Sequence, residues 1–331
     1  MVGRMQAIVQ DVYGAAPEDV LRVAEIEVPA PPGSGQVLVR IHAASVDRGT
    51  WHIMTGLPYA IRLAGFGVRR PKSASPGRSL AGVVESVGPD VADFQTGDEV
   101  YGIAPSSFAQ FALVGVDKVA PKPANTTFEQ AATVPISGLT ALQAVRDHGR
   151  IVAGEQALII GASGGVGSFA VQIAKAFGAE VTGVCGTAKR EMVRALGADH
   201  VLDYSTGDIT DGTKRYDVIL DIAGNRALRK LRRALSDRGR LLIVGGETDG
   251  RWLGGADRQV RATLMSPFVR HKLGTFICSE NAADLTVLAR LIESGDLTPS
   301  VERSYPLSEV AVAMCHLIDG RVRGKLAISV G

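Results

Sequence analysis

The chain has 331 residues, of which 46% are hydrophobic and 21% are charged, and its formal net charge is +2. This composition allows a large buried core and excludes an intrinsically disordered chain, and the length favours two domains. The small net charge and the lack of a long basic run argue against a nucleic-acid-binding protein. Every apolar stretch is interrupted before it reaches membrane-spanning length, so we expect no membrane partner.

The three cysteines, Cys185, Cys278 and Cys315, lie far apart in the sequence. No pair has the spacing of zinc ligands, and an odd number of cysteines suits a reducing compartment. Residues 1–9 lack the apolar core of a signal peptide. We therefore predict a cytoplasmic location.

Short strand patterns dominate the first part of the chain. The predicted strands cover residues 5–10, 21–28, 37–45, 82–88, 97–102 and 108–114. Strands of this length and spacing indicate a compact, β-rich, barrel-like domain. A short helix is expected over residues 49–54, with Asp47 placed to cap its N-terminus. Residues 56–75 are rich in Gly, Pro and Arg and are predicted to form a long loop that lines a site.

A proline-marked boundary at residues 118–124 precedes two predicted helices, one that begins near Thr127 and one over residues 137–145. Residues 157–160 are an apolar run that is typical of a buried strand, and residues 170–177 have the apolar spacing of a helix. The turn between them consists of Gly161, Ala162, Ser163, Gly164, Gly165, Val166 and Gly167.

A strand, a glycine-rich turn and a helix in this order bind the pyrophosphate of a dinucleotide. Glycine lets the backbone approach the phosphates, and the free N–H groups at the start of the helix point at the anion. The alternative interpretation is an ordinary connection between a strand and a helix. The apolar residues on both sides of the turn favour a dinucleotide site.

Strands and helices continue to alternate after Gly178. The predicted strands cover residues 180–184, 200–202, 216–222 and 240–244, and the predicted helices cover residues 188–196 and 227–235. This alternation indicates an α/β fold with right-handed βαβ units and a doubly wound parallel sheet of the Rossmann type. It fades near residues 255–270. The tail predicts a strand at 272–278, helices at 284–294 and 309–318, and a strand at 326–330.

The end of the second strand of this sheet predicts which nicotinamide cofactor is bound. NAD-selective sites carry an acidic residue there for the ribose 2′-hydroxyl, whereas residues 185–188 contain no carboxylate. Gly186 and Thr187 follow the strand, and Thr187 can donate a hydrogen bond. Lys189 and Arg190 supply cationic donors for a 2′-phosphate. We therefore predict NADPH, and the alternative is that both cations are solvated charges in the first turn of a helix.

Seven segments now form a recognisable set, which covers residues 43–47, 82–88, 97–102, 138–141, 161–167, 196–200 and 323–325. Together they resemble the medium-chain dehydrogenase/reductase superfamily, in its zinc-independent quinone oxidoreductase (zeta-crystallin-like) branch. The resemblance implies a GroES-like catalytic domain with an inserted Rossmann domain, and NADPH-dependent reduction with the cofactor in the cleft between domains. We place the discontinuous catalytic domain at residues 1–123 plus 272–331, and the NADP-binding Rossmann domain at residues 124–271.

The resemblance also bears on metal binding. In zinc-dependent relatives, a cysteine lies in the segment that matches residues 43–47, and a His-Glu pair precedes the segment that matches residues 82–88. Here the corresponding residues read Ala-Ala-Ser-Val-Asp and Gly-Arg-Ser-Leu-Ala, and residues 1–184 contain no cysteine for a structural zinc lobe. Because a zinc site needs about three converging ligands, we predict that no metal is bound.

Without zinc, another group must polarise the substrate oxygen. Asp47 stands where quinone reductases similar to this chain usually have Asn, and His52 and Tyr59 follow it as alternative donors. All three remain candidate catalytic residues. Each also has a structural interpretation, such as helix capping for Asp47 and loop packing for Tyr59.

The resemblance implies further cofactor contacts. It assigns Tyr204 to the 2′-phosphate and Thr140 to the nicotinamide. The loops that border the nicotinamide in similar proteins match Gly245, Gly246, Phe276, Ile277 and Cys278. Lys325 either reaches the cofactor from the tail or is solvated. Similar proteins pair the far edge of the Rossmann sheet across a two-fold axis, so we expect a homodimer.

Three functions are consistent with these observations. The first is a reductase of quinones or related conjugated carbonyl compounds, and the second is an enal, enone or enoyl-thioester reductase on the same scaffold. The third is an NADPH-binding protein with a structural or sensing role and little turnover. The shape of the substrate pocket separates the first two, and the sequence does not reveal it.

Overall fold

The computed structural model describes residues 3–210, 213–246, 250, 252 and 254–331. The chain folds into two compact units, each described by itself below. The first contains residues 1–139, 280–295 and 299–331, and the second contains residues 140–279 and 296–298. The chain passes from the first to the second within α5 (Pro135–Gln143). One unit is therefore inserted into the sequence of the other, as predicted.

The first unit is built on a seven-stranded sheet with the order β14-β15-β3-β4-β5-β7, in which β6 also pairs with β3. The strands are β3 (Gln36–Val46), β4 (Ser79–Val87), β5 (Glu99–Ile103), β6 (Phe111–Gly115), β7 (Val119–Pro121), β14 (Val301–Pro306) and β15 (Lys325–Ser329). A separate antiparallel pair consists of β1 (Arg4–Val9) and β2 (Arg22–Glu27). Alternate residues of β3 and β4 point inward, and Val37, Val39, Ile41 and Leu80 are buried completely or almost so.

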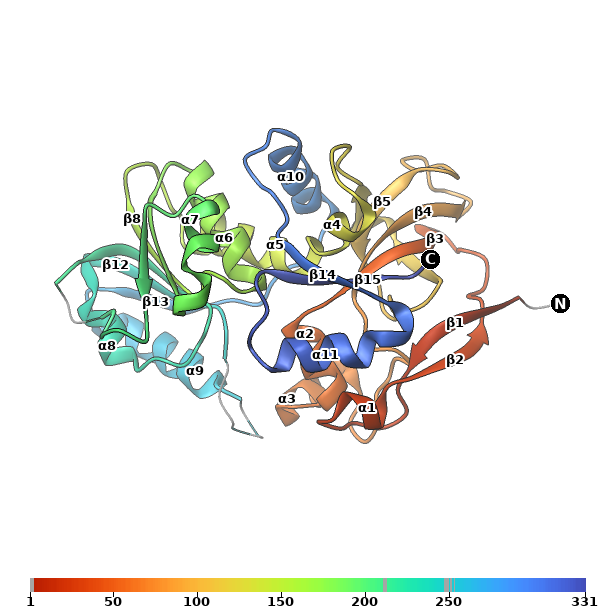
Figure 1. Cartoon of the computed structure of the whole chain (residues 1–331), viewed down its shortest axis with the longest axis horizontal. Helices are drawn as coiled ribbons and strands as arrows, with labels where there is room; N and C mark the ends of the chain where they lie inside the picture. The colour runs from red at the N-terminus through yellow and green to blue at the C-terminus, as the bar shows by residue number, and fades with distance from the viewer. Residues whose placement is uncertain (1–2, 211–212, 247–249, 251, 253) are drawn as a thin grey trace. The chain divides into compact units, whose positions relative to one another are not determined.

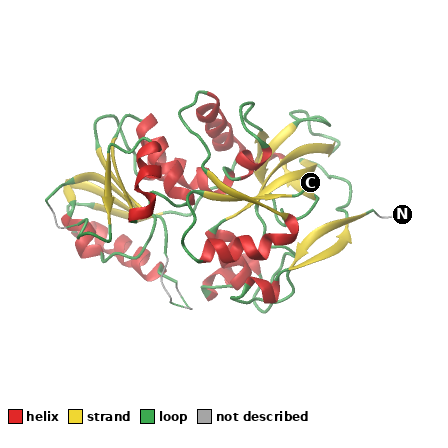
Figure 2. Ribbon diagram, viewed as in Figure 1, coloured by secondary structure: helices red, strands yellow, loops and turns green. Residues whose placement is uncertain are grey.

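The helices of the first unit are α1 (Pro17–Val20), α2 (Arg48–Thr55), α3 (Tyr59–Ile61), α4 (Phe128–Ala132), α10 (Ala282–Glu293) and α11 (Val310–Ile318). Helices α4, α10 and α11 contact the strands of the sheet, and Figure 2 shows them in red beside the yellow strands. Helix α11 buries Val310, Ala313 and Met314 against β3 and β15. This spacing of three and four residues is the apolar face of an amphipathic helix.

The second unit is a six-stranded sheet with the order β10-β9-β8-β11-β12-β13, and every pair in it is parallel. Its strands are β8 (Gln156–Ile160), β9 (Glu180–Cys185), β10 (His200–Asp203), β11 (Tyr216–Asp221), β12 (Leu235–Ile243) and β13 (Lys272–Thr275). Its helices are α6 (Gly165–Ala176), α7 (Arg190–Ala195), α8 (Leu228–Arg233) and α9 (Ala256–Met265), labelled in Figure 1.

The strand order explains why both faces of this sheet are covered. From β8 the chain moves outward to β9 and β10, and after β11 it moves the other way to β12 and β13. Right-handed crossovers in opposite directions place α6 and α7 on one face and α8 and α9 on the other. The central strand β8 is covered on both sides, and Ala157, Leu158 and Ile159 are completely buried. The predicted doubly wound α/β fold class is confirmed.

Several boundaries differ from the predictions. Strand β13 ends at Thr275 rather than 278 and pairs with β12, so it belongs to the Rossmann-like unit. The chain crosses between the two units near residues 139 and 279, whereas the predicted domain boundaries were at 123 and 271. Strand β4 starts at Ser79 and β12 at Leu235, both earlier than expected. Helices α1, α3 and α9 and strands β7 and β14 were not predicted, and α3 lies within the predicted loop at 56–75.

Candidate functional site

The glycine-rich turn between β8 and α6 has the geometry of an anion-binding loop. Gly161 has a φ of +88°, which favours glycine, and its N–H donates to Val184 O at 3.1 Å. A Cβ on Gly167 would lie 2.0 Å from Gly161 O, so only glycine permits this close approach of helix and strand. Gly164 caps α6 without a side-chain hydrogen bond, which leaves first-turn N–H groups available to a ligand. The residues present therefore fit the pyrophosphate of a dinucleotide.

The predicted 2′-phosphate residues gather where β9 and β10 end. These two strands are parallel, and Asp203 lies opposite Cys185. A Cβ on Gly186 would lie 3.0 Å from the Tyr204 hydroxyl, which places Tyr204 against the turn after β9. The Thr187 hydroxyl lies 3.2 Å from the Ser205 hydroxyl. The turn after β9 and the turn after β10 thus form one corner, which we call the β9–β10 corner.

Arg190 begins α7 at this corner. Its Nε–H is buried and has no hydrogen-bond partner among the described residues. A buried donor without an acceptor costs free energy, and an anionic ligand supplies the missing acceptor. The corner thus offers a guanidinium donor where a 2′-phosphate is expected.

Sequence reasoning missed a carboxylate at the same corner. Asp203 is 7% exposed, and its Oδ1 accepts hydrogen bonds from the Ser205 N–H at 2.9 Å and the Ser205 hydroxyl at 2.6 Å. The pKa of Asp203 is lowered by these Ser205 bonds, by the Thr187 hydroxyl and by the charge of Arg190. The pKa of the Cys185 thiol is raised, chiefly by burial and also by the charge of Asp203. The positive charges of Arg190 and Lys189 lower this pKa and so partly offset the rise.

Asp47, one of the three predicted catalytic residues, caps α2 in the first unit. Its Oδ1 accepts from the Thr50 N–H at 2.8 Å and from the Thr50 hydroxyl at 3.1 Å. The capping role is therefore confirmed. The other oxygen, Oδ2, is buried and has no hydrogen-bond partner among the described residues, and the Lys325 ammonium lies 3.9 Å from it.

Lys325 is buried, which excludes the solvated alternative, and its contact with the cofactor stays a prediction. Its side chain is 2% exposed, and Nζ donates to Val46 O at 3.2 Å. Burial lowers the pKa of Lys325, and the charge of Asp47 partly offsets this effect. We call the two side chains the Asp47–Lys325 pair. It joins α2 to β15, because β15 lies beside β3 in the sheet.

His52 and Tyr59, the other two predicted catalytic residues, lie in α2 and at the start of α3. The His52 Nδ1 lies 2.7 Å from Leu57 O. Because a carbonyl oxygen only accepts, Nδ1 carries the proton, and the Nε2 of a neutral His52 is an acceptor. The Tyr59 ring lies under the Arg62 guanidinium, 4.8 Å from its centroid. The single N–H of a neutral His52 is thus used by Leu57 O, so of these two neutral side chains only Tyr59 has a donor to offer a substrate.

Two family models match the chain. One describes the alcohol dehydrogenase GroES-like domain and matches residues 33–143, and the other describes a zinc-binding dehydrogenase and matches residues 196–328. A mouse relative, NAD(P)H oxidoreductase RTN4IP1, mitochondrial, is 33% identical over 98% of this chain and 89% of its own. The chloroplast envelope quinone oxidoreductase homolog of Arabidopsis thaliana is 29% identical over 99% of both chains.

Solved structures agree with these matches. The quinone oxidoreductase from Coxiella burnetii superimposes with a TM-score of 0.84 at 28% identity and covers 99% of this chain and 100% of that one. The chain belongs to the medium-chain dehydrogenase/reductase superfamily, in its quinone-oxidoreductase-like branch. It is therefore an oxidoreductase of that superfamily, and its cofactor is a nicotinamide dinucleotide.

The remaining predicted cofactor residues of this medium-chain dehydrogenase/reductase lie as follows. Thr140 is half-buried in α5. A Cβ on Gly245 would lie 2.0 Å from Ile222 O, and Gly246 follows it, so two glycines bring this turn close to the end of β11. The Phe276 ring stacks on His148 with centroids 4.3 Å apart, whereas Ile277 is 95% exposed. Cys278 is half-buried and forms no disulfide with a described cysteine. Their contacts with the cofactor stay predictions.

An ion pair at the end of β11 also escaped the sequence reasoning. Asp221 is completely buried, and its Oδ2 lies 2.6 Å from Arg258 Nη2 of α9. Its Oδ1 accepts from the Gly224 N–H at 3.1 Å. The pair fixes the turn after β11, which lies beside Gly245. The acid alone could be found in the sequence, as the last residue of an apolar strand.

Proposed function

We propose that the protein is an NADPH-dependent reductase that transfers a hydride to a quinone or a related conjugated carbonyl compound. One observation carries the cofactor preference: the buried, unpartnered Nε–H of Arg190 at the β9–β10 corner. Lys189 precedes it, and no carboxylate lies at residues 185–188. A 2′-phosphate provides an acceptor for the Arg190 Nε–H and a negative charge beside Lys189 and Arg190, and the 2′-hydroxyl of NADH carries no such charge.

The glycine turn from Gly161 to Gly167 would bind the pyrophosphate, and Thr187 and Tyr204 would join Lys189 and Arg190 on the 2′-phosphate. When bound, NADPH would supply the hydride. The protein's own contribution is to bind and orient. The charge of Asp203 would repel a phosphate bound at the same corner. The Ser205 N–H and hydroxyl donate to Asp203 Oδ1 and hold this carboxylate oxygen in place.

Tyr59 is our proposal for the residue that polarises the substrate oxygen. Asp47 is committed to the cap of α2 through Oδ1, and the neutral His52 presents an acceptor at Nε2. A tyrosine hydroxyl is a donor at neutral pH. Tyr59→Phe should lower kcat for a conjugated ketone and leave NADPH affinity unchanged. If wild type and Tyr59→Phe have equal kcat, Tyr59 does not polarise the substrate oxygen, and His52 and Asp47 remain the candidates.

We further propose that the reaction needs no metal ion. The residues at the positions of the catalytic zinc ligands, 43–47 and 77–81, contain no cysteine, histidine or glutamate. Within the described ranges, no three His, Cys, Asp or Glu side chains gather as a metal site. Activity that survives dialysis against a chelator is the expected result, and stoichiometric zinc in the active protein would overturn the proposal.

A panel of electron acceptors tests the function directly. We expect NADPH oxidation with quinones and none with simple alcohols or unconjugated ketones. Preferential turnover of enals, enones or enoyl thioesters would favour the second function. Tight NADPH binding without turnover of any acceptor would favour the structural or sensing role.

We propose that the protein is a homodimer. Strand β13 pairs with β12 alone among the described strands, so its outer edge is open to a second copy. On α9, Val260 and Leu264 are four residues apart and 55% and 66% exposed, and Phe268 beyond the helix is 88% exposed. Exposed apolar side chains beside an open edge favour association. Light scattering should give twice the chain mass, and a monomer at micromolar concentration would contradict this proposal.

The cytoplasmic location stays a prediction. Nowhere in the described part of the chain is a helix both long and apolar enough to cross a bilayer. The similar proteins carry organelle names, mitochondrial in mouse and chloroplast envelope in Arabidopsis thaliana. Fractionation of the source cells would settle the compartment.

A further inference from the structure

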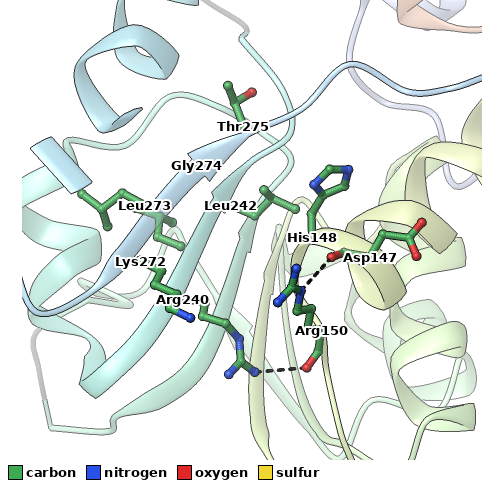
Figure 3. Close-up of a pocket in the computed structure, with 10 residues that line it drawn as sticks. Asp147, His148, Arg150, Arg240, Leu242, Lys272, Leu273, Gly274 and Thr275 are labelled. Atoms are coloured by element: carbon green, nitrogen blue, oxygen red, sulfur yellow. Dashed lines mark hydrogen bonds between the residues drawn. The ribbon is translucent and has the colours of Figure 1, made fainter. Parts of the chain in front are cut away.

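A hollow of about 310 Å³ lies on one face of the second unit's sheet, away from the glycine turn. Its walls come from β12, β13 and the turn after α5 (Figure 3). None of the predicted catalytic or cofactor residues lines it. Pockets of this size hold small organic molecules, and larger ligands need up to about three times that volume.

The floor of the hollow is open because one strand position has no side chain. In the register of β12 and β13, Arg240 lies opposite Lys272 and Leu242 lies opposite Gly274. Residues two apart on a strand share a face, so Lys272 and Gly274 both face the hollow. A Cβ built on Gly274 meets no atom within 4 Å. No neighbouring atom therefore requires a glycine at this position. The missing side chain leaves open space above Leu242.

Two cations stand side by side at one end of this floor. The Arg240 guanidinium is compensated, because Nη2 lies 2.5 Å from Glu155 Oε2 and Nε donates to Gly149 O at 2.7 Å. Lys272 is exposed and forms no ion pair or hydrogen bond with a described residue. Of these two cations, Lys272 is therefore the one whose charge no described carboxylate balances. An anion beside Lys272 would balance it.

The wall adds a third cation. Arg150 has a φ of +48°, which is uncommon for a residue with a side chain, and its Nε lies 3.3 Å from Asp147 O. The one carboxylate of the lining, on Asp147, is already paired with Arg146 at 2.6 and 2.7 Å. The lining thus carries uncompensated positive charge. Figure 3 shows the cationic side chains toward one end and His148 and Thr275 toward the other.

We propose that this hollow binds a small organic anion, a carboxylate or a phosphate monoester with an apolar body, at a site separate from the nicotinamide cofactor. The anionic group lies between Lys272 and Arg150, where ammonium and guanidinium donors meet it. The apolar body lies over Gly274 and Leu242. His148, which stacks on Phe276, closes the far end.

Calorimetry on the full-length protein tests this site with benzoate and phenyl phosphate as probes and benzyl alcohol as the uncharged control. We expect at least one of the two anions to bind once per chain, with or without saturating NADPH, and benzyl alcohol to bind at least about tenfold more weakly. The better of the two probes identifies the anionic group that the site prefers.

Three variants localise the binding. Lys272→Ala should weaken the anion about tenfold, because it removes a charged hydrogen-bond donor. Gly274→Leu should abolish binding, because its side chain fills the open floor. The matched control is Arg229→Ala, which removes the same charge from an exposed position of α8 outside the lining and should change the affinity less than about twofold. Circular dichroism would verify that each variant is folded.

Four results would overturn the site. They are no saturable binding of either anion, equal binding of benzyl alcohol, binding that Lys272→Ala and Gly274→Leu leave unchanged, and binding that saturating NADPH abolishes. The last result would assign the anion to the cofactor site. Because the readout is binding and not turnover, it is independent of the proposed reductase function.

Discussion

Two cationic regions of this protein are built in opposite ways. Lys325 is buried in the first unit, and its ammonium already has a carboxylate and a carbonyl oxygen close by. Arg190 lies at the β9–β10 corner of the second unit, and its buried Nε–H has no partner in the described structure. The first cation is part of the fold, and we propose that the second binds the 2′-phosphate of the cofactor. On that proposal, the partners of a charge, more than its burial, indicate its role.

The largest expected effect comes from breaking the Asp47–Lys325 pair. Lys325→Met leaves the Asp47 Oδ2 buried without its cation, so the free energy of unfolding should fall by about 3–5 kcal/mol. The double variant Lys325→Met, Asp47→Asn should recover most of this loss, because Asn keeps the cap of α2 and removes the charge. Urea unfolding measures both values.

The matched control for this prediction is Arg323→Met. Arg323 lies two residues earlier in the same tail and is exposed, so this substitution should change stability by less than about 0.5 kcal/mol. If Lys325→Met costs no more than Arg323→Met, the pair does not stabilise the first unit, and the contrast with the β9–β10 corner fails.

The same pair predicts how stability changes with pH. Burial lowers the pKa of Lys325 in the folded protein below its ordinary value of 10.5. Between the folded and the unfolded pKa, the unfolded chain binds more protons, so stability rises as the pH rises toward 10.5. Wild type should therefore gain stability relative to the Lys325→Met, Asp47→Asn variant between neutral pH and pH of about 10. Parallel curves for the two proteins would contradict this pKa direction.

The smallest effect is expected at the β9–β10 corner from Asp203→Asn. The charge of Arg190 helps to lower the pKa of Asp203, so the two groups interact. The Asp203 carboxylate would therefore compete with a bound 2′-phosphate for Arg190, and its charge would repel the phosphate. Its removal should tighten NADPH about threefold and leave NADH affinity nearly unchanged. Fluorescence titration with NADPH and with NADH measures both affinities.

Asp208→Asn is the control for this prediction, since Asp208 pairs with Lys230 away from the corner. Weaker NADPH binding by Asp203→Asn would show that Asp203 organises the corner instead.

The sequence predicted the elements whose signals are local. The glycine turn, the apolar strand before it and the cap at Asp47 depend on residues within about one helical turn of each other, and each was found in the structure. Strand β14 was missed because Glu302, Arg303 and Ser304 are all exposed, so no apolar alternation marks it. Helix α9 was missed because Ala262 is its only buried residue, which leaves no apolar stripe.

Contacts between residues that are distant in the sequence were not predicted, for a different reason. Asp47 and Lys325 are 278 positions apart, since the sheet pairs β3 near the start of the chain with β15 at its end. Asp203 reaches the β9–β10 corner because parallel strands end at one edge of a sheet. The hollow at Gly274 depends on strand register and on a missing side chain. A periodicity argument contains none of this information.

The NADPH to NADH ratio of kcat/KM tests the central claim most directly, measured with one quinone acceptor in wild type and in Lys189→Ala, Arg190→Ala. Wild type should prefer NADPH by about a hundredfold, and the double variant should lose about tenfold or more of that preference through the KM for NADPH. The kcat/KM for NADH should differ by less than about twofold between wild type and the double variant. A preference for NADH in wild type, or an unchanged ratio in the variant, would contradict the assignment of the β9–β10 corner to the 2′-phosphate.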